Sequence, residues 1–228
     1  MFYFDWTYLL LIPGLILGLW AQAKVKSAYA KYSKVPTQRG EPAAAVVLEL
    51  LHQQDVDDMT VTPVSGELTD HFDPKTNDLR LSQGVYGSSS IAAVGIAAHE
   101  AGHALQKKEN YGPLALRSVM VPAVNIGSTA AWPIFVLGLL FSWQPLQWAG
   151  IACFSLAVLF ALITLPVEFD ASRRAMAMLS GSGYFTREEE AGVKKVLTAA
   201  AMTYVASFVS VLLQLLRLIL IANSRRRD

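Results

Sequence analysis

Apolar residues gather in four long runs along this chain, and polar residues fill the stretches between them. The runs are about Tyr3–Ala23, Val119–Phe141, Trp148–Val167 and Ala199–Ala222. Each run approaches the roughly 20 apolar residues that a helix needs to cross a bilayer. Only SWQPLQ joins the middle two runs, which predicts a tight helical hairpin. The pattern therefore predicts a mainly α, polytopic membrane protein with about four membrane helices.

The polar stretches predict a small water-facing part. After Glu41-Pro42, apolar residues share one helical stripe, which predicts an amphipathic packing helix. GELTDHFDPKTNDLRLSQ predicts two short strands around a turn, a β-hairpin. Serines at 88–90 offer N-caps for a helix over about 91–108. Thr186 and Glu189 form a capping box, so another helix starts there and continues toward the last run.

Charges on either side of the first run set the expected orientation. Nothing basic precedes its apolar core, whereas five cations follow closely: Lys24, Lys26, Lys31, Lys34 and Arg39. This asymmetry predicts an uncleaved anchor whose C-terminal side faces the cytoplasm. The alternative is a cleaved signal peptide, because Ala21-Gln22-Ala23 resembles a cleavage site.

The last run opposes this orientation. A fourth full crossing places Arg225, Arg226 and Arg227 on the far side, against the usual charge bias. Because Gln214 and Arg217 interrupt the run, the alternatives are a full crossing or a segment that re-enters or packs along the protein.

Composition supports burial in lipid and excludes one class of partner. The chain is 53% hydrophobic and 16% charged, whereas about a quarter of the residues of a soluble protein are charged. A formal net charge of +1 offers no broad field for nucleic acid, so no nucleic-acid partner is expected. The single cysteine, Cys153, cannot form an internal disulfide.

The stretch AAHEAGHALQ carries the chemistry. Residues four apart on a helix share a face, so His99 and His103 can direct imidazole nitrogens at one metal ion. Glu100 beside them can hold a metal-bound water and take its proton. An accidental HExxH in a chain of this length has odds of about one in two hundred. The alternative is two helix histidines satisfied by local hydrogen bonds.

A third ligand is needed, because a catalytic zinc usually takes three protein ligands and one water. The remaining histidines are His52 and His71, and the one cysteine lies in an apolar run. Glu168 follows the third run directly, at the start of the next predicted helix. Since the chain crosses the bilayer twice between His103 and Glu168, both return to the same side. The sequence therefore predicts one Zn²⁺ per chain, held by His99, His103 and Glu168.

Three further residues are candidates for support of the site. Asp170 and Arg174 are spaced for a surface ion pair, which is the plainer interpretation. Alternatively, Asp170 accepts a hydrogen bond from a ligand imidazole. Arg173 or His71 can stabilise an oxyanion, although a lone polar histidine at a turn is more often an ordinary surface residue.

The segments LTDHFDP, LRLS, AAHEAGHALQ, LPVEFDAS and AAMTYVAS together resemble the YugP-type membrane zinc metallopeptidases, distant relatives of the HtpX and CAAX-prenyl membrane proteases. The resemblance covers nearly the whole chain. It implies a gluzincin with His99, His103 and Glu168 as ligands and Glu100 as general base. The wider group has a bracing aspartate where this chain has Ser172. Those relatives also carry a catalytic histidine further along, which this chain lacks, so oxyanion support falls to His71, an arginine or Tyr184.

The expected architecture is one membrane-embedded metallopeptidase domain over residues 1–228. It comprises an anchor (1–23), a cytoplasmic zincin-like catalytic part (24–116), a membrane hairpin (117–167), a third-ligand helix region (168–198), and a last apolar segment with a basic tail (199–228). The expected function is a zinc-dependent endopeptidase of the cell membrane that hydrolyses a peptide or protein substrate near the cytoplasmic surface of the lipid bilayer.

Two other functions stay open. One is a non-catalytic membrane scaffold with a structural zinc, which has no need of Glu100. The other is a metal-dependent hydrolase of non-peptide substrates, because a zinc-activated water attacks other electrophiles as well. For the peptidase, the alternation over Leu79–Ser82 suggests that an exposed strand of the hairpin accepts an extended substrate by edge pairing, unless protein covers both edges of the hairpin.

Overall fold

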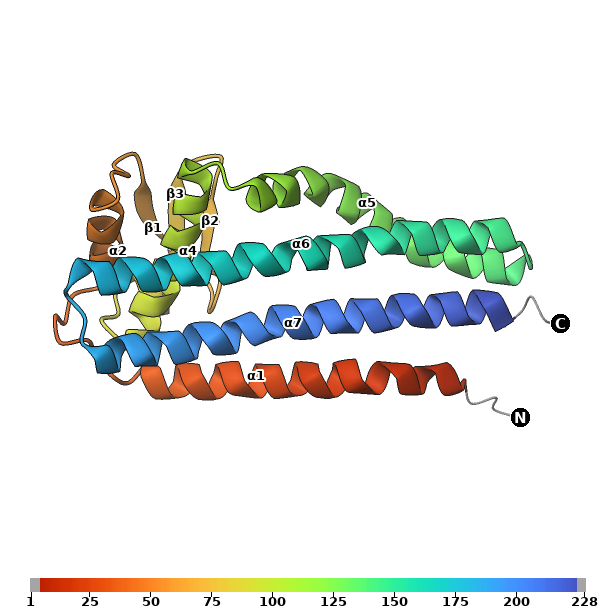
Figure 1. Ribbon diagram of the computed structural model, residues 1–228, viewed down its shortest axis with the longest axis horizontal. Coiled ribbons are helices and arrows are strands. Elements are labelled where there is room, and N and C mark those ends of the chain that lie inside the picture. The colour runs from red at the N-terminus through yellow and green to blue at the C-terminus, as the bar shows by residue number, and fades with distance from the viewer. Residues whose placement is uncertain (1–4, 225–228) are drawn as a thin grey trace. The chain divides into compact units, whose positions relative to one another are not determined.

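The computed structural model describes residues 5–224, and Figure 1 shows the order of their elements. Contacts divide these residues into two units. The bundle unit contains residues 5–21, 115–166 and 203–224, and the polar unit contains residues 22–114 and 167–202. Four long helices contribute residues to both units: α1 (Ile12–Tyr32), α5 (Gly112–Leu140), α6 (Gln144–Ser182) and α7 (Arg187–Ser224).

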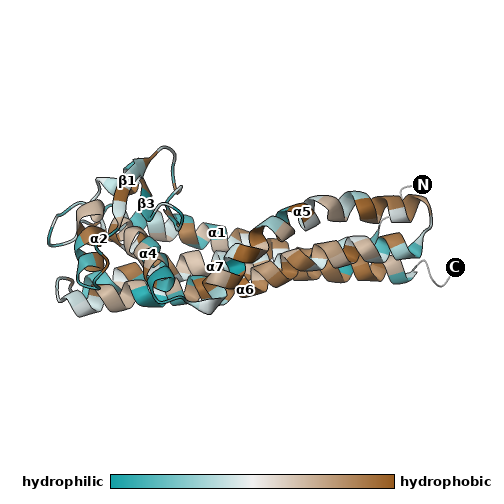
Figure 2. Cartoon of the chain, turned by 90° about the horizontal axis from the view of Figure 1, so that it is seen from above, coloured by the Kyte–Doolittle hydropathy of each residue, from teal (hydrophilic) through white to brown (hydrophobic). Residues whose placement is uncertain are grey.

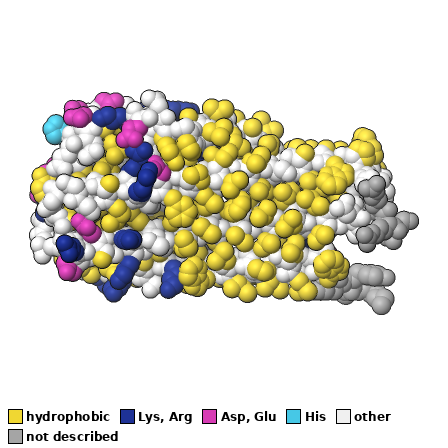
Figure 3. Space-filling view, viewed as in Figure 1, with side chains coloured by type: hydrophobic (Ala, Val, Ile, Leu, Met, Phe, Trp, Pro, Cys, Tyr) yellow, Lys and Arg dark blue, Asp and Glu magenta, His cyan; other side chains and the backbone are white. Residues whose placement is uncertain are grey.

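Among the described residues, four helices are long and apolar enough to cross a membrane: Trp6–Tyr32, Gly112–Leu140, Gln144–Ser182 and Arg187–Ser224. The first comprises the short 3₁₀ helix η1 (Trp6–Leu11) and α1, and the second is α5 (Gly112–Leu140). Hydrophobic residues dominate these helices in Figure 2, and Figure 3 shows hydrophobic side chains covering a wide area of the surface. The structure therefore confirms two parts of the prediction: the chain is mainly helical, and it has four candidate membrane helices.

Small residues let the helices of the bundle unit approach closely. A Cβ atom on Gly150 would lie 2.7 Å from the backbone nitrogen of Phe135, and one on Gly138 would lie 2.6 Å from that of Gln147. Phe135 of α5, Phe154 of α6 and Leu218 of α7 belong to one buried cluster. Packing of this kind is usual between membrane helices, where close backbone approach replaces the hydrophobic effect as the driving force.

The last apolar run lies within one unbroken helix, α7 (Arg187–Ser224), which is long and apolar enough for a full crossing. The full crossing stays a prediction. Arg217 does not interrupt the helix, because its buried guanidinium has partners. It donates to Thr7 Oγ1 at 3.0 Å and to Asp5 Oδ2 at 2.8 Å, and its central carbon lies 3.8 Å from the centre of the Tyr8 ring. Paired intramembrane charges avoid the large cost of an isolated one. The arginines at 225–227 lie outside the described residues.

The polar unit contains a three-stranded sheet in the order β1–β3–β2. The predicted hairpin is present: β2 (His71–Asp73) pairs antiparallel with β3 (Asp78–Ser82). The sequence did not predict β1 (Thr60–Val64), which pairs parallel with β3. Pro63 obscured this strand, but proline is tolerated on an edge strand, where β1 lies. β3 is central and has no free edge, whereas β2 lies at the edge of the sheet. The hypothesis that the hairpin pairs with an extended substrate therefore stays a prediction, and it now rests on β2.

Helices pack on this sheet as their apolar faces require. The amphipathic helix is α2 (Ala43–His52), which buries Val46, Val47, Leu50 and Leu51 in one core with Leu79 and Leu81 of β3. Short helix α3 (Gln83–Tyr86) leads to α4 (Ile91–Lys108), whose N-cap Ser90 accepts a hydrogen bond from the Ala93 N–H. α4 covers the residues that the serine caps predicted, and it carries HEAGH.

One helix boundary was wrong. The sequence predicted that a membrane helix ends near Val167 and that a new helix starts at Glu168, but α6 runs without a break from Gln144 to Ser182. Pro166 lies inside it and removes one backbone hydrogen bond, a loss that helices in a membrane protein tolerate. Glu168 is therefore held within a rigid helix. The capping box at the start of α7 is confirmed, because Thr186 and Glu189 exchange side chain to backbone hydrogen bonds.

Gly102 sets the distance between α4 and α6. A Cβ atom there would lie 2.3 Å from the carbonyl oxygen of Ala171, closer than any real contact. Ala97, Ala98 and Ala101 on the same helix are fully buried. The backbones of the two helices therefore touch, which brings the side chains on either side of Gly102 and Ala171 within reach of one another.

We predict that Gly102→Ala forces α4 and α6 apart and destabilises the protein by about 1–3 kcal/mol. Gly181→Ala is the matched control, because Gly181 is also helical and a Cβ there meets no atom within 4 Å. The control should leave stability unchanged or raise it by up to about 1 kcal/mol. Thermal unfolding in detergent measures both changes. Equal melting temperatures for the two variants would contradict the assigned contact.

Candidate metal centre

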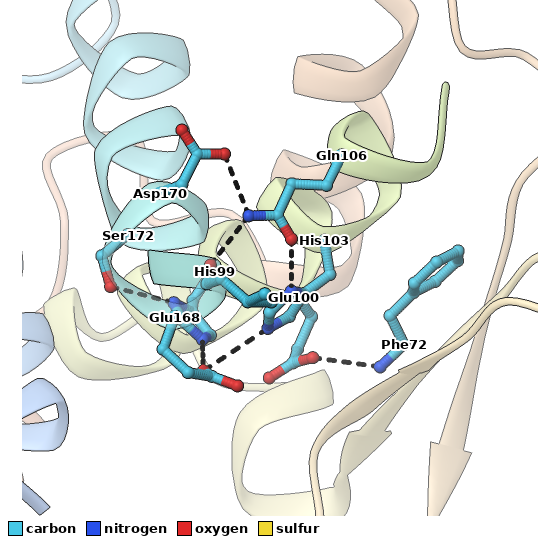
Figure 4. A network of polar contacts seen from close by, with 9 residues as sticks. Phe72, His99, Glu100, His103, Gln106, Glu168, Asp170 and Ser172 are labelled. Carbon is cyan, nitrogen blue, oxygen red and sulfur yellow. Dashed lines mark hydrogen bonds and ion pairs between the residues drawn. The ribbon is translucent and has the colours of Figure 1, made fainter. Parts of the chain in front are cut away.

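Three side chains from α4 and α6 converge at one point. The Nε2 atom of His99 lies 3.2 Å from Glu168 Oε2, and the Nε2 atom of His103 lies 3.6 Å from the same oxygen. The two imidazole rings meet edge to face, with their centres 4.9 Å apart. Figure 4 shows the three side chains turned toward one another. The structure thus brings together the three residues that the sequence predicted as ligands.

The spacing of these atoms fits a tetrahedral metal ion. Zinc bonds of about 2.0–2.2 Å at tetrahedral angles place neighbouring ligand atoms about 3.4 Å apart. The two distances to Glu168 Oε2 lie on either side of that value, and the candidate ligand atoms all lie within 4.8 Å of one another. Two imidazole nitrogens with one carboxylate oxygen form the donor set of many catalytic zinc sites, which leaves a fourth position open. The residues therefore fit zinc.

The second nitrogen of each imidazole has its own partner. Nδ1 of His103 lies 2.9 Å from Oε1 of Gln106, and Nδ1 of His99 lies 3.1 Å from Oγ of Ser172. The Gln106 oxygen can only accept, so Nδ1 of His103 carries the proton and its Nε2 presents a lone pair to the cluster. This arrangement prepares Nε2 for metal binding.

Glu100 lies beside the cluster without being one of the converging donors. Its Oε2 accepts a hydrogen bond of 3.0 Å from the backbone N–H of Phe72, which lies on β2 (Figure 4). The negative charge of Glu100 raises the pKa of the His103 imidazole. The strand thus holds the carboxylate next to the imidazoles.

Burial and charge act against each other on His103. Its imidazole is buried, which by itself lowers its pKa because burial disfavours the charged form. The contact with Glu168 and the negative charges of Glu100 and Glu168 raise the pKa further than burial lowers it. The net effect is a pKa above the usual value of histidine, so a proton competes for this imidazole near neutral pH.

Asp170 occupies a different position from the one predicted. It pairs with Arg174, whose Nε lies 2.6 Å from Oδ2, but the carboxylate is buried and does not form a surface ion pair. It also makes no direct bond to an imidazole in the described part of the chain. Instead it accepts a hydrogen bond of 2.9 Å from Nε2 of Gln106, and one from Arg173. The side chain of Arg173 is otherwise 76% exposed.

The candidates for oxyanion support have partners elsewhere. His71 is exposed on β2, and its Nδ1 lies 2.8 Å from the carbonyl oxygen of Thr69. The hydroxyl of Tyr184 accepts a hydrogen bond of 3.2 Å from Gln53, and the guanidinium of Arg39 lies over its ring. Within residues 5–224, neither side chain forms a hydrogen bond or ion pair with the three converging side chains. Their predicted role stays a prediction.

Sequence reasoning missed Gln106. It lies in the same motif, three residues after His103, so the two side chains share a helical face. A glutamine between buried apolar residues on that face was the available signal. Ser172 was mentioned only because related proteases have an aspartate at this position. Its hydroxyl lies 3.1 Å from Nδ1 of His99, so it contacts a candidate ligand.

Comparison with known proteins agrees with this geometry. A family profile described as "Putative neutral zinc metallopeptidase" matches residues 7–223. The chain is also 47% identical over 219 residues to the "Putative membrane protease YugP" of Bacillus subtilis (strain 168), an alignment that covers 96% of this chain and 97% of that protein. No solved structure matches. Because the profile spans almost its entire length, the chain belongs to the family that this profile describes.

Proposed function

We propose that the protein is a zinc-dependent membrane endopeptidase. The observation that carries the proposal is the convergence of His99, His103 and Glu168 on one point, with the Glu100 carboxylate held beside it. The name of the Bacillus relative, a membrane protease, supports peptide bonds as the substrate class over other electrophiles. In this proposal the whole chain works as one metallopeptidase domain of the gluzincin type.

Each residue has a distinct task. The Nε2 atoms of His99 and His103 and a carboxylate oxygen of Glu168 hold the zinc ion. When bound, zinc lowers the pKa of a water and polarises the carbonyl of the scissile bond. Glu100 takes the proton of that water and then gives it to the leaving amine. The Phe72 N–H directs the Glu100 carboxylate, because a hydrogen bond to one oxygen leaves the other free to accept the proton.

Glu100 also separates this proposal from the scaffold alternative. A structural zinc site is closed by four protein ligands and has no need of a nearby base. Here three donors converge, and the Glu100 carboxylate is hydrogen-bonded to β2 and is not one of them. An open fourth position beside an ionised carboxylate is what hydrolysis requires.

We predict that Glu100→Gln keeps zinc and loses hydrolysis. The change removes the proton acceptor and leaves the three ligands in place, so the hydrolysis rate should fall by at least about 100-fold. The matched control is Glu188→Gln, a change of an exposed glutamate in the first turn of α7, which should hydrolyse peptides at the normal rate. Zinc content by mass spectrometry and cleavage of a peptide library in detergent are the measurements. Normal proteolysis by Glu100→Gln would falsify the assigned role.

Zinc affinity should depend on pH through His103. Zinc binding must displace the proton that the raised pKa keeps on this imidazole, so lowering the pH weakens binding. The dissociation constant should therefore increase as the pH falls from about 8 to about 6. Chelator competition, corrected for protonation of the chelator, measures it. A constant affinity across this range contradicts the assignment of His103 as a ligand.

We further propose that the site lies on the cytoplasmic side of the cell membrane. The cations that follow the first apolar run support this orientation, because basic residues favour the cytoplasmic side. The multi-pass arrangement then places the turn between α5 and α6 outside.

Cysteine labelling tests this orientation. In a Cys153→Ala background, an impermeant maleimide should label Gln144→Cys in intact cells. It should label Lys75→Cys only after the membrane is permeabilised. Both residues are exposed, so the two variants are matched for access. The opposite labelling pattern would show that the proposed orientation is wrong.

A further inference from the structure

We propose that Gln106 is a positioning residue for His103, and that Asp170 acts on His103 through it. The proposal rests on the proposed zinc function, since it assigns how one ligand of that site is held. It concerns a chain of three groups that joins α4 to α6: the His103 imidazole, the Gln106 carboxamide and the Asp170 carboxylate (Figure 4).

The Gln106 carboxamide is completely buried and uses both of its ends. Its Nε2 lies 2.7 Å from the carbonyl oxygen of Val167 and 2.9 Å from Oδ2 of Asp170. Both of those partners can only accept, so the NH₂ group must point at them. The carboxamide oxygen is thereby directed at Nδ1 of His103, 2.9 Å away. The partners of the carboxamide therefore determine which end is the oxygen and which is the nitrogen.

The orientation of the amide fixes the proton of the imidazole. An oxygen facing Nδ1 requires an N–H there, and the neutral ring then has its lone pair on Nε2, the atom that faces Glu168. If the amide turned round, its NH₂ would meet Nδ1, and its oxygen would meet two acceptors. Val167 and Asp170 therefore favour the tautomer that has its proton on Nδ1 and its lone pair on Nε2. The other tautomer, with the proton on Nε2, has no lone pair there to bind a metal ion.

Asp170 is itself held by Arg174. Nε of Arg174 lies 2.6 Å from Oδ2, and Arg174 also pairs with Glu109 at 2.7 Å. A carboxylate bonded directly to a ligand histidine makes the imidazole a stronger donor to the metal. Here the negative charge of Asp170 reaches His103 only through a neutral amide, and His99 has the neutral hydroxyl of Ser172. The acceptors behind both imidazoles are therefore neutral.

The test compares zinc binding by the full-length protein in detergent. Gln106→Met keeps the length of the side chain and removes both polar ends. The matched control is Gln147→Met, which removes a buried glutamine whose Nε2 donates to the Gly138 carbonyl oxygen in the bundle unit. Asp170→Asn alone and together with Gln106→Met tests whether Asp170 acts through Gln106. Zinc affinity by chelator competition and the visible spectrum of the cobalt-loaded protein are the readouts.

We expect Gln106→Met to weaken zinc binding about 10–100-fold and to change the cobalt spectrum. Gln147→Met should change the melting temperature without either effect. Asp170→Asn should weaken zinc binding by a smaller factor, and the double variant should match Gln106→Met alone. Zinc affinity within about twofold of the unmodified protein in folded Gln106→Met overturns the proposal, as does full additivity in the double variant.

The outcomes separate this inference from the proposed function. If the unmodified protein binds no zinc, the proposed function fails. If it binds zinc tightly and Gln106→Met binds equally well, the positioning role alone fails. If Gln106→Met does not fold, Asp170→Asn decides, because unchanged affinity and an unchanged cobalt spectrum in that folded variant overturn the proposal.

Discussion

The site depends on one steric constraint, the contact between the backbones of α4 and α6 at Gly102 and Ala171. Histidine and glutamate side chains are short, so two helices can direct them at a single ion only when their axes are close. No residue larger than glycine fits at position 102 without moving the helices, since its Cβ would overlap the Ala171 carbonyl oxygen. The Gln106 hydrogen bond to Val167 fastens the same two helices one turn further along. The distances within the cluster follow from this contact.

The second feature of the site is that its buried carboxylates each have hydrogen-bonding or charged partners. Glu168 and Asp170 are almost completely buried, and a buried carboxylate without compensation is very costly. Glu168 faces two imidazoles, and Asp170 faces an amide and two guanidinium groups. Replacing such a network with apolar residues would often be neutral or stabilising, so stability alone does not explain why the chain carries it. A site prepared for a cation gives these groups a reason to be there.

The sequence predicted the features that depend on local patterns. Helical spacing paired His99 with His103, the capping box located the start of α7, and alternation located the β2–β3 hairpin. Features that depend on distant contacts were missed. β1 is stabilised by parallel pairing with the distant strand β3, and its own residues show no periodic pattern. The end of the apolar run at Val167 suggested a helix end, but α6 continues to Ser182. Gln106 has meaning only beside Val167 and Asp170, roughly 60 residues further along the chain. The candidate ligand Glu168 was found because zinc chemistry requires a third donor, which is a chemical constraint and not a local pattern.

The most direct test of the central claim is a structure of the zinc-loaded protein. The account predicts one zinc ion bound by Nε2 of His99, Nε2 of His103 and a carboxylate oxygen of Glu168, each at about 2.0–2.2 Å, with water in the remaining position. A zinc ion that has Glu168 outside its coordination shell, or that takes Glu100 as a ligand, would contradict it.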